Sequence, residues 1–267
     1  MLLRADQVSK SYRKPGRWLK PEQTTVLKGV SLTIQQGECV GLVGESGSGK
    51  STLGRLLMGI EKPDSGTVYF RNHLVNSTGY QQVRQQMSVV FQDYGTSVNR
   101  RYRVKSILEE PLKIANKMAS KDFQSHNIRL LETVGLSEKF MDRYPHELSG
   151  GQLQRVCIAR AIANQPDLVI LDEAISSLDV TIQLQILDLL VKLRKEMKLS
   201  YFFITHDLLA VTYLCDRVLF MKEGEIIEEV GDMKALDQVA HPYARTLLEA
   251  AMKVTGVTWN NHIQKIS

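Results

Sequence analysis

Gly44-Glu45-Ser46-Gly47-Ser48-Gly49-Lys50-Ser51 is the stretch that decides the fold. Its spacing satisfies GxxxxGK[ST], in which glycines let backbone N–H groups turn toward phosphates while the lysine reaches the β- and γ-phosphates. A β-type run at residues 38–43 precedes it, and residues 50–60 follow with leucines at helical spacing. The order strand, glycine loop, helix predicts a nucleotide phosphate loop rather than an ordinary glycine turn. We expect Ser51 to ligate magnesium and Thr52 to add a contact to ATP.

A second stretch, Leu168-Val169-Ile170-Leu171-Asp172-Glu173, is an apolar strand that ends in two carboxylates. One acid at such a strand end can hold magnesium and the other can orient an attacking water. We assign Asp172 to the metal and Glu173 to the water. Acidic residues end many strands for solubility alone, so the phosphate loop earlier in the chain is what favours the catalytic interpretation.

A third stretch, Leu148-Ser149-Gly150-Gly151-Gln152, is rare at average composition, since it would occur by chance in only a few chains per ten thousand, roughly. Its two glycines allow close backbone approach, and they open a predicted helix whose N-terminal amides can face a γ-phosphate. Ser149 can add a hydroxyl donor or cap the helix, and both roles use the same helix end. We therefore expect residues 149–152 to contact ATP.

The patterns on either side of these motifs predict an α/β fold. Apolar and polar residues alternate at 3–8 and 26–34, which indicates strands flanking a polar loop at 13–23. Two short apolar runs within residues 168–204 flank an amphipathic helix at about 181–198. This βαβ order is typical of a buried parallel sheet.

Helical patterns replace strand patterns in the middle of the chain. We expect a nucleotide-binding core at 1–103 and 166–230, a helical subdomain at 104–165 and a C-terminal tail at 231–267. A hairpin at 218–230 closes the core, and the last dozen residues of the tail are expected to be loosely ordered.

The composition narrows the classes of protein to which this chain can belong. The 267 residues are 43% hydrophobic and 24% charged, and no apolar run reaches the 18 or so residues of a membrane span. The start of the chain lacks a secretory pattern, so we expect a cytoplasmic protein. Three separated cysteines give no metal or redox spacing. The net charge of +5 is compatible with nucleic acid or an anionic membrane surface, but the basic residues are spread out, so the charge by itself decides nothing.

Together, these motifs make the sequence resemble the ATP-binding cassette (ABC) family, and the resemblance extends from Tyr12 to about Val230. The resemblance implies a P-loop NTPase (RecA-like) parallel-sheet core, an N-terminal antiparallel β subdomain and an inserted α-helical subdomain. By the same resemblance Tyr12 stacks on adenine, and Gln92 joins the nucleotide site to the helical subdomain and to magnesium. His206 contacts the γ-phosphate, and Ser177-Leu178-Asp179 signals across a dimer, with Asp179 near ATP.

The resemblance also implies partners. The phosphate loop of one subunit and residues 148–152 of another would enclose each ATP, so the active species is expected to be a dimer with a related second ATPase. Two membrane permease subunits and an extracytoplasmic substrate-binding protein complete the expected importer. We expect the chain to lie peripherally at the cytoplasmic face of the inner or cell membrane, with ATP and Mg²⁺ as its ligands.

The tail segment His241-Pro242-Tyr243-Ala244-Arg245-Thr246-Leu247-Leu248 is similar to that of peptide and nickel importers, with a plain helix start as the alternative. Residues 152–157, residues 91–93 and Ala174 after Glu173 are more similar to the nickel-importing members, so we expect nickel, with a di- or oligopeptide as the alternative. The six histidines show no ligand spacing for nickel itself. Other classes considered are a soluble cassette ATPase acting on nucleic acid, a subunit that binds ATP without hydrolysing it, and a P-loop kinase.

Overall fold

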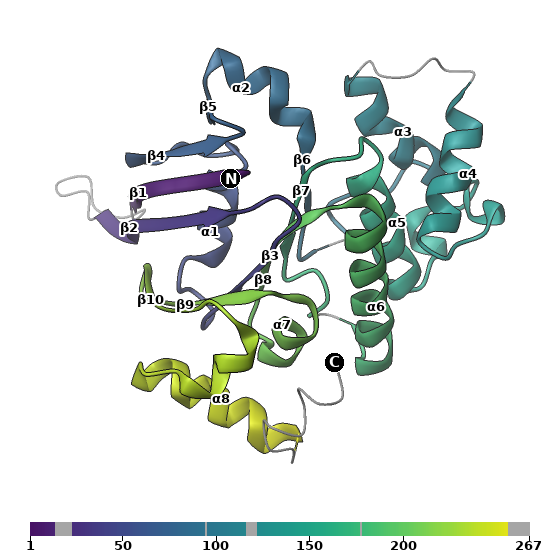
Figure 1. Cartoon of the computed structure of the whole chain (residues 1–267). Helices are drawn as coiled ribbons and strands as arrows, with labels where there is room; N and C mark the ends of the chain where they lie inside the picture. Colours follow the sequence, from purple (N-terminus) through teal and green to yellow (C-terminus); the bar gives the residue numbers. More distant parts are fainter. Residues whose placement is uncertain (14–22, 94, 116–121, 177, 256–267) are drawn as a thin grey trace. The chain divides into compact units, whose positions relative to one another are not determined.

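The computed structural model describes residues 1–13, 23–93, 95–115, 122–176 and 178–255 (Figure 1). Most of the polar loop predicted at 13–23 and the last dozen residues lie outside these ranges. The chain forms two compact units, one of Met1–Val83 with Phe202–Ser267 and one of Arg84–Tyr201. The functional domains predicted with boundaries at 103, 165 and 230 remain a separate hypothesis.

An antiparallel sheet opens the first unit. Its strands lie in the order β2-β1-β4-β5, with bounds β1 Leu3–Arg13, β2 Gln23–Ile34, β4 Ser65–Phe70 and β5 His73–Leu74. Leu3 and Ala5 of β1 are buried, as their alternation predicts, and Val8 is buried after a register shift between Ala5 and Val8. Strands β4 and β5 and the helix α2 at Thr78–Val83 follow; from the sequence we predicted no strand or helix at these positions.

The second sheet of this unit is mostly parallel and supports the phosphate loop. Strands β10, β9, β3 and β8 are neighbours in that order; β3 spans Cys39–Val43, β8 Ser200–Thr205, β9 Arg217–Lys222 and β10 Glu225–Val230. Strand β3 is parallel to β9, while β10 returns antiparallel to it as the predicted hairpin. The helices of the unit are α1 Lys50–Leu57, α7 Leu208–Leu214 and α8 Pro242–Thr255, with a 3-10 turn at Met233–Gln238.

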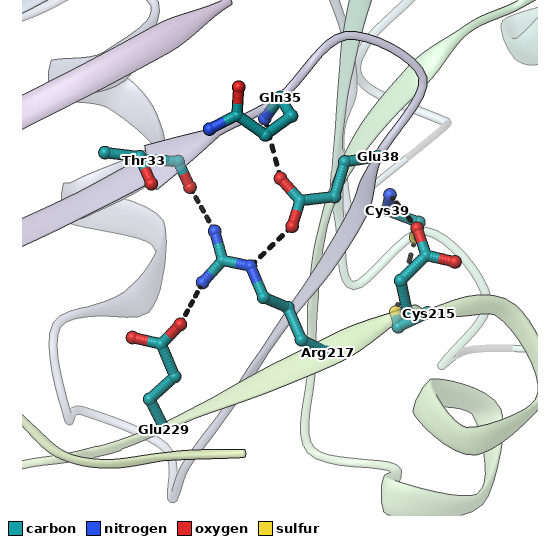
Figure 2. A network of polar contacts seen from close by, with 8 residues as sticks. Thr33, Gln35, Glu38, Cys39, Cys215, Arg217 and Glu229 are labelled. Atoms are coloured by element: carbon teal, nitrogen blue, oxygen red, sulfur yellow. Dashed lines mark hydrogen bonds and ion pairs between the residues drawn. The ribbon is translucent and has the colours of Figure 1, made fainter. Parts of the chain in front are cut away.

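One buried arginine ties the two sheets of the first unit together (Figure 2). Arg217, at the start of β9, donates to Glu38 at 2.6 Å and to Glu229 of β10 at 2.5 Å. The remaining guanidinium nitrogen of Arg217, Nη2, donates to the backbone carbonyl of Thr33 in β2. Glu38 in turn accepts the backbone N–H of Gln35 at 2.6 Å, so the turn that leads into β3 is fixed from both sides.

The second unit is mainly helical. Two parallel strands, β6 Met87–Val90 and β7 Leu168–Asp172, carry the helices α3 Val104–Ala115, α4 Phe123–Thr133, α5 Gly150–Ile162 and α6 Val180–Met197. Short 3-10 turns lie at Arg84–Gln86, Glu138–Phe140 and Pro145–Glu147. Within residues 104–165 the described part contains no strand, as predicted. The α/β fold with an antiparallel N-terminal sheet and a helical region is therefore confirmed.

Candidate functional site

The phosphate loop lies between β3, whose five residues are all buried, and α1. Gly47 and Gly49 have φ values of 83° and 107°, a region that side chains other than glycine seldom adopt. A Cβ on Gly49 would also lie 2.9 Å from the Val26 carbonyl oxygen. The glycine spacing therefore has a steric cause in this structure, and the predicted order strand, loop and helix is present.

Two polar groups inside the loop have properties suited to phosphate. Lys50 is only 4% exposed, and its ammonium group donates to the carbonyl oxygens of Gly44 at 2.7 Å and Glu45 at 2.8 Å. The Ser48 hydroxyl is buried without a hydrogen-bond partner among the described residues. Buried polar groups are normally paired, so an orphan hydroxyl in the same loop as a buried ammonium fits an anionic ligand.

Backbone bonds hold the loop against the β9–β10 hairpin. Gly224, at the hairpin turn, donates its N–H to the Ser48 carbonyl at 3.0 Å, and Lys28 of β2 donates to the Gly224 carbonyl at 2.9 Å. A Cβ on Gly44 would overlap the Met221 carbonyl of β9. These contacts fix the loop from outside, so its conformation does not depend on its own residues alone.

Tyr12 of β1, predicted to stack on adenine, is joined to the helix after the loop. Its hydroxyl bonds to the Glu61 carboxylate, which also accepts from Arg55 of α1 at 2.6 Å. Arg55 donates to the Thr52 hydroxyl at 3.1 Å. Burial opposes ionisation of Glu61, but the bonds from Tyr12 and Arg55 lower its pKa below the usual value. The tyrosine is thus held beside the loop helix by a charged network within one unit.

His206 follows β8 in the same unit and is exposed. The next residue, Asp207, caps α7 by accepting the N–H groups of Leu209 at 2.9 Å and Ala210 at 3.2 Å. The Asp207 N–H donates to the Thr205 hydroxyl at 3.0 Å. The cap fixes the turn on which the exposed His206 stands.

The second unit carries its own group of predicted site residues. Strands β6 and β7 are parallel with Val90 opposite Leu171, so the residues after them share one edge. There the Gln92 amide donates to the Glu173 carboxylate at 2.9 Å. Glu173 itself has a φ of 47°, an uncommon conformation for a side-chain-bearing residue. Two residues 81 positions apart in sequence, predicted as catalytic, are thus brought into contact, and the backbone turn aims Glu173.

The 149–152 stretch opens α5 as predicted. Ser149 is the N-cap: its hydroxyl accepts the Gln152 N–H at 3.3 Å, and its own N–H donates to the Gln152 side chain at 3.0 Å. The structure adds a second reason for Gly151, because a Cβ there would lie 2.7 Å from a methyl carbon of Ile182 in α6. The glycine serves close packing of two helices, and a ligand contact can coexist with that role.

Gln154 is a residue that the sequence reasoning did not single out. It is fully buried in α5, and its amide donates to the Ala174 carbonyl at 2.6 Å. Ala174 directly follows Glu173, so α5 is bonded to the turn that carries the carboxylate. The signal in the sequence was a polar residue in the buried face of an amphipathic helix.

Asp179 is the N-cap of α6 and accepts the Ile182 N–H at 3.0 Å. This capping role explains an aspartate at that position and leaves one carboxylate oxygen for another partner. Ser177, quoted with it as part of the signalling loop, lies outside the described residues.

The chain is similar in sequence to known proteins. The ABC transporter family matches residues 27–176. The metal-staphylopine import system ATP-binding protein CntF of Staphylococcus aureus is 44% identical over 93% of this chain and 98% of its own. The nickel import ATP-binding protein NikE of Rhodospirillum rubrum is 42% identical over 94% and 91%. The dipeptide transport protein DppF of Haemophilus influenzae is 42% identical over 95% and 79%.

Solved structures of ATP-binding cassettes are also similar to this chain. The ATP-binding cassette MJ0796, solved as a dimer in a post-hydrolysis state with ADP and Pi, has a TM-score of 0.76 at 31% identity and covers 86% of this chain and 98% of its own. CbiO1 of Clostridium perfringens has a TM-score of 0.75 at 28% identity and covers 96% and 97%.

The chain belongs to the ABC transporter family. It is an ATP hydrolase coupled to transport, and the relatives named above are importer ATPases of the peptide/nickel group. In the described part of the chain, no helix is both long and apolar enough to cross a bilayer.

Proposed function

We propose that this chain binds MgATP through residues 44–52 and cleaves it with Glu173, in order to drive nickel uptake by an importer. The observation that carries the catalytic assignment is the 2.9 Å hydrogen bond between Gln92 and Glu173. It places the proposed base beside the residue proposed to sense the nucleotide.

In this proposal Lys50 and the loop amides neutralise phosphate charge, and the Ser48 hydroxyl donates to a phosphate oxygen. Phosphoryl transfer needs positioning and charge stabilisation more than covalent help from the protein, and a buried ammonium beside glycine N–H groups supplies both. Lys50, whose ammonium the structure shows on two loop carbonyls, can exchange these neutral acceptors for charged phosphate oxygens.

Mg²⁺ is proposed to be held by the Ser51 hydroxyl, the Gln92 amide oxygen and, through water, Asp172. These are hard oxygen donors of the kind that Mg²⁺ prefers, and the Gln92 amide nitrogen is the atom bonded to Glu173, which leaves its oxygen as the acceptor. The ion supplies charge neutralisation between the phosphates. The residues of the chain position the reacting groups. Glu173 accepts the proton of the attacking water, and Gln92 keeps the Glu173 carboxylate in place.

The remaining contacts to ATP are assigned to Tyr12 at adenine, His206 at the γ-phosphate, and Asp179 with residues 149–152 across a dimer. The Ser149 cap supports this, because the N-terminus of α5 carries partial positive charge that attracts an anion. The MJ0796 cassette was solved as a dimer, and by analogy the second subunit here is proposed to be a related ATPase. Two permease subunits and an extracytoplasmic substrate-binding protein are proposed to complete the importer, with this chain peripheral at the cytoplasmic face.

Nickel is proposed ahead of peptide on the similarity of residues 152–157, residues 91–93 and Ala174 to nickel-importing members. The relatives named for nickel, dipeptide and metal-staphylopine import have 42–44% identity to this chain, so identity alone does not rank these substrates. The substrate specificity is assigned to the partner proteins, because the described residues contain no cluster of three or more His, Cys, Asp or Glu that could hold a metal. A nucleic-acid role is not favoured by any feature of the site.

The test is uptake of labelled nickel and of a labelled dipeptide, measured in parallel in cells whose intact transporter carries wild-type chain or Glu173→Gln. A matched control is Glu196→Gln, which neutralises an exposed carboxylate on α6. Loss of nickel uptake alone is expected. Loss of dipeptide uptake alone would overturn the substrate, and loss of neither would overturn the role of this subunit in both transporters.

A further inference from the structure

The C-terminal helix α8 has no part in the roles assigned so far, yet it is firmly packed. It contacts α7 of its own unit, and its Ala244 and Leu248 side chains are buried. It begins at Pro242, directly after His241. Proline suits the first turn of a helix because its missing N–H would have no partner there.

The chain just before α8 is anchored to β10. The carboxylate of Glu228 accepts the Ala240 N–H at 2.6 Å and the His241 N–H at 3.0 Å. The His241 imidazole then acts as an N-cap, since its Nδ1 accepts the Tyr243 N–H at 3.1 Å. Hydrogen bonds to a carboxylate are stronger than those between neutral groups, so the position of Tyr243 is well defined.

From this position the Tyr243 side chain reaches the phosphate loop. The Glu45 N–H donates to the Tyr243 hydroxyl at 2.9 Å, although the two residues are 198 positions apart. The Lys222 ammonium of β9 lies 5.0 Å from the centre of the tyrosine ring, a distance suited to a cation–π contact. Burial raises the pKa of Tyr243, so the phenol is neutral at physiological pH and accepts through its oxygen.

This bond completes the support of the loop. The Ser48 carbonyl is held by Gly224, and the Lys50 ammonium bonds to the carbonyls of Gly44 and Glu45. The Glu45 backbone N–H donates its bond to the Tyr243 hydroxyl, and Glu45 lies just after β3 ends, at the start of the glycine turn. The bond therefore fixes the end of the loop at which the Lys50 acceptors lie.

We propose that α8 is a brace for the phosphate loop and that Tyr243 is its positioning residue, holding the loop in the conformation that accepts ATP. The inference rests on the proposed binding of ATP at residues 44–52. Without the hydroxyl the loop would spend part of its time in other conformations, and the apparent affinity for ATP falls in proportion to the competent fraction. A neutral hydrogen bond sets the scale of that effect at about threefold to tenfold in the dissociation constant.

The experiment compares full-length wild-type chain with Tyr243→Phe, which removes the hydroxyl and keeps the ring. Dissociation constants for MgATP are measured by equilibrium titration, and hydrogen exchange at the Glu45 amide is followed without nucleotide. The matched control is Tyr201→Phe, because the Tyr201 hydroxyl is also hydrogen-bonded, in its case to the Leu190 carbonyl of α6 at 3.1 Å. His241→Ala, which removes the cap of α8, is a second route to the same effect.

We expect Tyr243→Phe to weaken ATP binding about threefold to tenfold and to speed exchange at Glu45, with Tyr201→Phe leaving both unchanged. In the assembled transporter the same variant raises the KM for ATP and leaves kcat near the wild-type value, a split that a general loss of stability would not produce. Unchanged affinity and unchanged Glu45 exchange in Tyr243→Phe would overturn the brace. Absence of ATP binding by the wild-type chain, with Lys50→Ala no different from it, would instead overturn the proposed nucleotide site.

Discussion

Replacement of Arg217 by methionine tests how the first unit is held together (Figure 2). The methionine fills much of the same volume but removes the three donated bonds to Glu38, Glu229 and the Thr33 carbonyl. The turn into β3 and the β9–β10 hairpin would then lose their shared partner. Both elements support the phosphate loop, so the loss of stability should also affect the conformation of this loop.

The exposure of each partner sets the magnitude. Glu38 is 16% exposed, and a charged hydrogen bond in such surroundings contributes about 1.5–3 kcal/mol. Glu229 is 53% exposed, so solvent screening reduces its pair to at most about 1 kcal/mol. With the Thr33 carbonyl left unpaired as well, we expect Arg217→Met to lower the free energy of unfolding by about 3 kcal/mol.

Urea unfolding of the full-length protein, followed by circular dichroism, measures this change. The single variants Glu38→Gln and Glu229→Gln rank the two pairs, and the Glu38 variant is expected to cost more. Arg217→Lys should recover less than half of the loss, because one ammonium cannot replace a planar group with three bonded partners. A loss below about 1 kcal/mol for Arg217→Met, or equal costs for the two glutamates, would refute the reasoning.

Two further predictions concern packing and charge. Gly151→Ala places a methyl group 2.7 Å from Ile182, so it should destabilise the protein by about 1–3 kcal/mol in urea unfolding, and combination with Ile182→Ala should remove most of that cost; simple additivity of the two changes would contradict the clash. Hydrogen bonds from the Ser11 N–H and from Lys10 lower the pKa of Asp64, so its favourable contribution is present above the unfolded pKa of about 3.9 and is lost as pH falls through the folded value. Asp64→Asn should therefore cost less than about 1 kcal/mol at pH 7 and nothing in acid, and a difference that grows on acidification would be the opposite of this expectation.

Much of the site could be predicted from sequence because its signals are local. The glycines of residues 44–49, the Ser149 cap and the acidic end of β7 each express a steric or electrostatic requirement within a few residues. The role of Gln92 was implied only by resemblance, and its contact with Glu173 was not predicted; the parallel pairing of β6 with β7 supplies the physical cause of that contact.

Other parts could not be predicted because their causes are distant in sequence. The bond from Glu45 to Tyr243 and the bond from Gln154 to Ala174 join segments whose proximity depends on tertiary packing. Strand β6, at four residues, and helix α7, at seven nearly all apolar residues, are too short for a reliable period. The packing role of Gly151 likewise becomes visible only when Ile182 is placed beside it.

The most direct test of the account is ATP turnover by the assembled transporter with Glu173→Gln, alongside ATP binding by the same variant. If Glu173 accepts the proton of the attacking water, turnover should fall about a hundred- to ten-thousand-fold while ATP is still bound. Turnover equal to that of the wild-type protein would contradict the assignment and would place the catalytic base elsewhere.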